Sequence, residues 1–287
     1  MIQPILPAVS LTKKDIIAQL QREILPLQGY KPPSAGGAVD TGLGPVIAAF
    51  PNARFPTGAV HEFLSAGPEC AAAAGGFMAG LLAALMQKES VCVWISSSRT
   101  LFPAALKTFG VDPSRIIFAD LRREKDVLWA MEQALSCEGL AAVVGEIQEI
   151  GFTASRRLQL AVEQSRVTGF LLRHRPRNIN AVACVARWRI TPLPSASDAG
   201  LPGVGFPCWK VELLKVRNGR PGSWVIEWSD GAFHAVEKSP EGVLSGELLL
   251  EEACFERISP EKISLGRISP EAASLEEAPQ EERRKTG

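Results

Sequence analysis

The sequence predicts an α/β fold: a mostly parallel sheet flanked by helices, with an antiparallel C-terminal extension. Between residues 59 and 173, short β-rich runs alternate with helical ones. The β-rich runs are apolar at nearly every position, which is typical of parallel strands covered on both faces. After residue 173, further β-rich runs are joined by Pro- and Gly-rich turns without an intervening helix, which is typical of antiparallel neighbours.

These runs define one core domain over residues 55–236. The predicted parallel strands are 59–64, 91–96, 115–119, 140–144 and 168–173, and helical patterns occupy segments near 70–88, 100–109, 124–137 and 153–166. The predicted antiparallel strands are 181–190, 208–216 and 223–228.

An amphipathic helix is predicted at the N-terminus, within residues 1–30. Its apolar stripe includes Ile16, Ile17, Leu20 and Ile24, which are candidate contacts for a partner protein. The alternative is a helix that folds back on its own domain, and the sequence favours neither. Residues 31–54 are rich in Gly, Pro and Ala and predict a linker.

The C-terminal residues 237–287 predict a disordered acidic tail. They carry 12 acidic and 7 basic side chains and no tryptophan or tyrosine, so they bury too little apolar surface to offset ordering entropy. Leu248, Leu249, Leu250 and Phe255 form a candidate docking peptide, and the alternative is an apolar cluster without a role.

Composition excludes several classes of protein. The formal net charge is zero, so no global field attracts the chain to nucleic acid or a membrane. The six cysteines are scattered, without a C-x-x-C pair or histidines at ligand spacing, so we expect no zinc site and no disulfide framework. No signal peptide is recognisable, and the apolar run 70–87 is too short and Ala-rich for a membrane span. We therefore expect a buried core helix there and a cytoplasmic protein.

Residues 65–77 (SAGPECAAAAGGF) resemble the start of a phosphate-binding loop, directly between a β-rich run and a helical one. Such a loop needs glycines that expose backbone N–H groups, a lysine for the phosphates and a hydroxyl for magnesium. Here Gly67, Pro68 and Glu69 open the segment, but Ala72, Ala73 and Ala74 stand where glycine, lysine and threonine belong. The simpler alternative is an alanine-rich helix that begins with Gly-Pro.

The wider chain resembles RecA-type proteins in the same register. Residues 102–112 (FPAALKTFGVD) are similar to the RecA helix that ends in Leu-Gly-Val-Asp, and counting back from them places Ser98 where RecA carries its catalytic glutamate. Gly145 takes the position of the magnesium-associated aspartate. The resemblance is greatest to the ImuA group of RecA-related proteins, also compared with the division inhibitor SulA, and its markers are residues 20–25, 42–44, 49–51, 54–58, 61–63, 143–146 and 158–160.

This resemblance implies an accessory role in damage-induced, error-prone translesion DNA synthesis. The implied partners are an ImuB-like inactive relative of Y-family polymerases and an error-prone polymerase, with RecA as a further candidate, and a membrane is not among them. With its ATP-handling positions replaced, the chain is expected to be no enzyme and to need no cofactor. Two alternatives stay open: a SulA-like inhibitor of cell division, and a divergent ATPase that takes its lysine from Lys107 or Lys210.

One basic segment is a candidate DNA contact. Arg173, Arg175 and Arg177 follow a predicted strand, at the place where RecA proteins carry a DNA-contacting loop. The alternative is a solvated edge whose arginines form salt bridges. Glu146 and Glu149, just past another strand, are interpreted as loop or helix-start acids and not as a catalytic pair.

Overall fold

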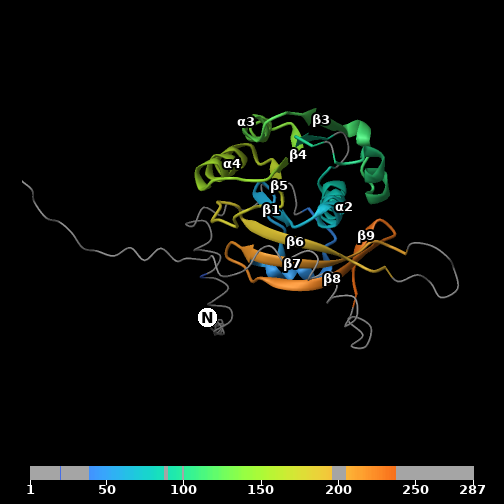
Figure 1. Ribbon diagram of the computed structural model, residues 1–287. Coiled ribbons are helices and arrows are strands. Elements are labelled where there is room, and N and C mark those ends of the chain that lie inside the picture. The colour runs from blue at the N-terminus through green and yellow to red at the C-terminus, as the bar shows by residue number, and fades with distance from the viewer. Residues whose placement is uncertain (1–19, 21–38, 87–89, 99, 196–204, 237–287) are drawn as a thin grey trace, which may run out of the picture.

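The protein is built around one nine-stranded sheet (Figure 1). The computed structural model describes residue 20 and residues 39–236, apart from 87–89, 99 and 196–204. Across the sheet the strands follow the order β3-β2-β4-β5-β1-β6-β7-β8-β9. Their bounds are β1 (Val60–Ser65), β2 (Val91–Ser96), β3 (Ile116–Asp120), β4 (Leu140–Ile147), β5 (Thr168–His174), β6 (Ala186–Leu193), β7 (Cys208–Val216), β8 (Gly222–Ser229) and β9 (Ala232–Ala235).

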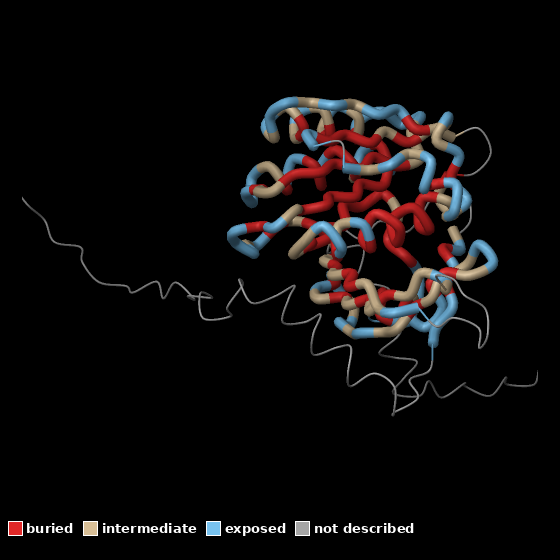
Figure 2. The backbone as a smooth tube through the Cα atoms, turned by 45° about the vertical axis from the view of Figure 1, so that its right-hand side comes forward, coloured by how far each residue is buried: buried red, intermediate tan, exposed pale blue. Residues whose placement is uncertain are grey.

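The first five strands are parallel and are covered by helices on both faces. Helix α2 (Pro68–Leu85) lies on one face, where its Phe77 joins a core cluster with Val144 of β4. Helices α3 (Glu124–Leu135) and α4 (Phe152–Ser165) cover the other face, where Met131 packs with Val143. Figure 2 shows the central strands and α2 as the buried interior of the molecule. The predicted class, a mostly parallel sheet flanked by helices with an antiparallel C-terminal extension, is confirmed.

Strand β6 departs from the prediction that all later strands pair antiparallel. It pairs in parallel with β1, from His61↔Ala186 to Leu64↔Arg189, and its other edge pairs antiparallel with β7. It begins at Ala186 and not near residue 181, because the preceding segment is bonded to other elements: the Ala183 amide donates to Ser155 Oγ at 2.9 Å and Val185 to the Val60 carbonyl. The short strand β9 was not predicted.

The C-terminal part of the predicted linker belongs to the core, so that boundary was wrong. Residues 44–53 form two 3₁₀ helices, Gly44–Ala49 and Pro51–Ala53. Leu43, Val46 and Phe50 are buried, and the Phe50 ring lies 5.6 Å from that of Trp188. Burial of these apolar side chains stabilises the segment in the core, although its Gly- and Pro-rich composition is typical of a linker. Residues 31–38 of the predicted linker and the tail 237–287 lie outside the described residues.

Helix α2 is long and apolar enough to cross a membrane by length and composition, but it is the central core helix of the described fold. Two of its glycines allow a close approach to aromatic side chains. A Cβ at Gly80 would lie 2.5 Å from the Phe233 ring, and one at Gly76 would lie 2.8 Å from Phe109. The prediction of a buried helix in this segment is therefore confirmed.

His61 on β1 is fully buried and is held in its neutral form. Its ring stacks on Phe55 with 4.5 Å between centroids. The Trp188 indole donates to His61 Nδ1 at 3.3 Å, so Nε2 carries the proton toward the Pro56 carbonyl at 2.8 Å. Burial disfavours the charged imidazolium and lowers the pKa of His61 to about 4.

We expect the free energy of unfolding to fall as the pH drops from about 6.5 toward 4. In this window the unfolded chain binds a proton at His61 that the folded chain excludes, and this group contributes a loss of about 2 kcal/mol between pH 7 and pH 5. Urea denaturation at both pH values measures the loss. The His61→Gln variant is the control, and an equal pH dependence in both proteins would contradict the assignment to His61.

Candidate functional site

A pocket of about 670 Å³ lies at the carboxyl ends of the parallel strands. It is bounded by the start of α2, by the segment that follows β2 and by the ends of β4 and β5. Its lining includes Gly67, Pro68, Ala71, Ala72, Gly75, Gly76, Trp94, Ser98, Thr100, Leu101, Phe102, Leu106, Phe109, Glu124, Glu146, His174 and Arg175. A ligand crevice in an open α/β sheet is expected at this edge.

The predicted phosphate loop forms the first two turns of a helix. Strand β1 ends at Ser65 and α2 begins at Pro68, so two residues separate them. Ser65 Oγ donates to the Gly67 carbonyl at 2.8 Å, and the Ala71 amide donates to the same carbonyl at 2.9 Å as a regular helical bond. Ala72, Ala73 and Ala74 therefore follow α-helical geometry, and this segment forms no loop around a phosphate.

The three alanines also differ in their surroundings. Ala72 is exposed and lines the pocket, whereas Ala73 and Ala74 are buried in the core cluster of α2. Ala73 holds the lysine position of the resemblance, so a lysine there would start from the core and not from the pocket. Ser98, at the position of the catalytic glutamate, does line the pocket.

A carboxylate lies in the pocket one residue after Gly145, which the resemblance places at the magnesium-associated aspartate. A Cβ at Gly145 would meet Met131 Sδ at 2.6 Å, so this residue faces α3 on the far side of the sheet. Its neighbour Glu146 faces the pocket and is 2% exposed. The interpretation of Glu146 as a loop or helix-start acid was wrong, because β4 continues to Ile147.

Glu146 is already engaged by side chains of its own chain. Its Oε1 accepts from the Trp94 indole at 2.6 Å, and its Oε2 lies 3.1 Å from His174 Nε2 and 3.4 Å from Thr100 Oγ1. Alternation along the strand would have placed Glu146 on the face of Val144, but only if the strand had been extended past residue 144.

A second carboxylate, Glu124, lies at the pocket edge. Its Oε1 accepts from the Gln148 amide at 2.6 Å, which fixes the chain after β4. No lysine is among the described residues of the pocket lining, and two carboxylates are. Like charges repel more strongly in a partly buried site than in water, so these two carboxylates oppose binding of a triphosphate, while Arg175 of the same lining favours an anion. Within the described part of the chain, no group of three His, Cys, Asp or Glu side chains forms a metal site.

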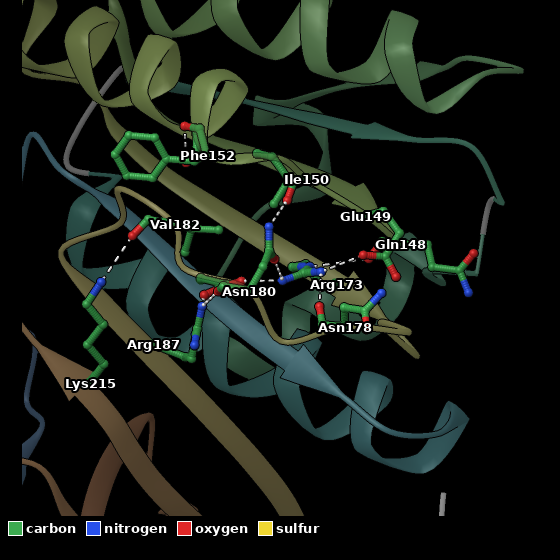
Figure 3. Close-up of polar contacts among 12 residues, drawn as sticks. Gln148, Glu149, Ile150, Phe152, Arg173, Asn178, Asn180, Val182, Arg187 and Lys215 are labelled. Carbon is green, nitrogen blue, oxygen red and sulfur yellow. Dashed lines mark hydrogen bonds and ion pairs between the residues drawn. The ribbon is translucent and has the colours of Figure 1, made fainter. Parts of the chain in front are cut away.

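Arg173 is fully buried, which overturns its prediction as a DNA contact. Its guanidinium bonds Glu62 Oε1 at 2.8 Å, Glu149 Oε2 at 2.9 Å and the Asn178 carbonyl at 2.9 Å (Figure 3). Arg187 of β6 also pairs with Glu62. Burial of an ion requires this saturation by partners, and the network ties the segment that follows β5 to the sheet.

Arg175 and Arg177 project from that tied segment and are exposed. The Arg175 amide donates to the Ser65 carbonyl at 2.7 Å, and its backbone has a positive φ of 46°. Both stay candidate DNA contacts. Of the candidate partner contacts, Leu20 is helical and 49% exposed, and Ile16, Ile17 and Ile24 lie outside the described residues.

Comparison with known proteins gives the family. No family model matches the chain. A solved structure, that of the RadB recombinase, has a TM-score of 0.49 at 14% identity and covers 69% of this chain and 100% of that one. Protein ImuA from two strains of Caulobacter vibrioides, NA1000 / CB15N and ATCC 19089 / CB 15, is 37% identical over 194 residues, which are 63% of this chain and 80% of that protein. At this identity and coverage, the chain belongs to the ImuA family.

Proposed function

We propose that this protein is a non-catalytic, RecA-related accessory factor of damage-induced translesion DNA synthesis, acting in the cytoplasm through protein contacts. Its proposed partners are an ImuB-like inactive polymerase relative and an error-prone polymerase, with RecA as a third. The observation that carries the proposal is that the residues of the phosphate loop form the first two turns of α2, in a chain of the ImuA family.

The absence of the phosphate-loop lysine and hydroxyl from residues 73 and 74 determines how much nucleotide affinity we expect the chain to have lost. A charge-assisted hydrogen bond contributes about 1.5–3 kcal/mol, so the absent lysine alone weakens binding by about tenfold to a hundredfold. Phosphoryl transfer also needs a placed metal ion and an oriented water, and the pocket carboxylate Glu146 is committed to Trp94 and His174.

We expect no ATP binding tighter than a Kd of about 1 mM in isothermal titration calorimetry with magnesium. The matched control is a RecA-type ATPase with an intact loop under the same conditions. Micromolar binding by this chain would contradict the non-catalytic role and favour a divergent ATPase.

We expect affinity purification of the tagged full chain from damage-treated cells to recover a polymerase-like protein. Leu20→Asp should reduce recovery, because it places a charge in the apolar stripe of the N-terminal helix, and Gln19→Ala, on its polar side, is the control. Recovery of a tubulin-like division protein in place of polymerases would overturn the proposal in favour of the SulA-like alternative.

A further inference from the structure

The described pocket has mainly apolar walls, and its two carboxylates already have hydrogen-bond partners inside the protein. Leu101, Phe102, Leu106 and Phe109 line one side and Ala71, Ala72, Gly75 and Gly76 of α2 line the other. Both oxygens of Glu146 accept hydrogen bonds, and so do both oxygens of Glu124. Phe102 is 71% exposed at this site, which is a large unpaired apolar surface next to a cavity. The pocket is therefore suited to apolar side chains.

The described chain ends close to this pocket. The Phe109 ring, which lines it, lies 5.7 Å from that of Trp228 on β8. Trp228 in turn lies 4.8 Å from Phe233 on β9, the last strand before residue 236. Phe233, four residues before the tail begins, is therefore two ring contacts from the pocket wall.

The tail carries one dense apolar stretch, residues 246–255 (GELLLEEACF). Leu248 follows Val236 by 12 residues, a span of about 40 Å when extended, which is ample for the short path to the pocket. A short tether holds such a segment at an effective concentration of about 1 mM, so weak contacts suffice for occupancy.

One cation of the pocket can pair with the acidic residues of this stretch. Glu247, Glu251 and Glu252 flank the leucines, and the exposed Arg175 lies at the pocket. We propose that residues 246–255 of the same chain dock in this pocket, with Leu248, Leu249, Leu250 or Phe255 between α2 and Phe102, so that the tail occupies the site that a nucleotide would need. The inference is independent of the partner proteins proposed above.

Hydrogen–deuterium exchange on the full-length chain tests this docking. We expect amides of residues 246–255 to exchange at least tenfold more slowly than those of residues 257–271, the adjacent tail sequence. Leu249→Asp should remove this protection by placing a charge in the apolar stretch, while Ile258→Asp, outside it, should leave the protection unchanged.

A variant of the pocket separates docking from local structure in the tail. Gly75→Leu fills the pocket, because a Cβ at Gly75 meets no atom within 4 Å, and we expect it to abolish the protection of residues 246–255. Protection that persists in Gly75→Leu, or equal exchange across the wild-type tail, would overturn the inference. Protection that increases with protein concentration would assign the occupant to a second copy and would equally overturn docking within one chain.

Discussion

Replacing Arg173 with methionine lowers the free energy of unfolding by about 3–5 kcal/mol, the expected cost of breaking a buried ion pair by removal of one partner. Arg173 and Glu62 are both 0% exposed, and the guanidinium also bonds the Asn178 carbonyl and Glu149. The variant removes this donor from Glu62 Oε1 and from the Asn178 carbonyl, and among the described residues Glu62 keeps only its pair with Arg187. Urea denaturation at pH 7 measures the change.

Arg177→Met is the matched control, because Arg177 belongs to the same basic segment but is exposed. We expect its free energy of unfolding to stay within about 0.5 kcal/mol of wild type. Equal stabilities of the two variants would show that the network does not hold the segment after β5. A loss of DNA affinity in Arg173→Met alone would then have to be interpreted as a direct contact.

Restoring the phosphate-loop lysine as Ala73→Lys destabilises the protein by about 3 kcal/mol or more and creates no ATP site. Ala73 is 7% exposed and lies in the core cluster with Phe77, so the longer side chain overpacks the core and its charge is buried. Thermal or urea denaturation measures the stability, and calorimetry with ATP and magnesium measures the affinity.

Ala72→Lys provides the comparison, with the same charge on the same helix. Residue 72 is exposed, so we expect a change in the free energy of unfolding within about 0.5 kcal/mol. ATP binding gained in Ala73→Lys, without a loss of stability, would show that α2 unwinds at its start into a working loop.

The local pattern of apolar residues predicted the strands and helices well, because apolar runs and the turn residues between them are properties of neighbouring residues. It placed β2 at residues 91–96, where the structure has it. It failed for residues 44–53, whose Gly- and Pro-rich composition is typical of a linker, because burial of Leu43, Val46 and Phe50 depends on distant partners such as Trp188.

The same holds for the candidate site: features set by neighbouring residues were predicted, and features set by distant residues were not. The sequence alone shows alanines at residues 72–74, where the resemblance places the residues that bind a phosphate. Their helical conformation agrees with the high helix propensity of alanine. The burial of Arg173 was not readable, because its partner Glu62 precedes it by 111 residues. The position of Glu146 in the pocket was not predicted, because the predicted strand ended at residue 144 and β4 continues to Ile147.

The place of β1 in the middle of the sheet has a consequence for synthesis on the ribosome. Val60 pairs with Gly169 on one side, and His61 pairs with Ala186 on the other. At about 5–20 residues per second, β1 leaves the ribosome roughly 5–20 s before either neighbour exists. Throughout that interval its apolar side chains have no strand to pair with, so early packing of α2 against β1, or a chaperone, is the expected protection from aggregation.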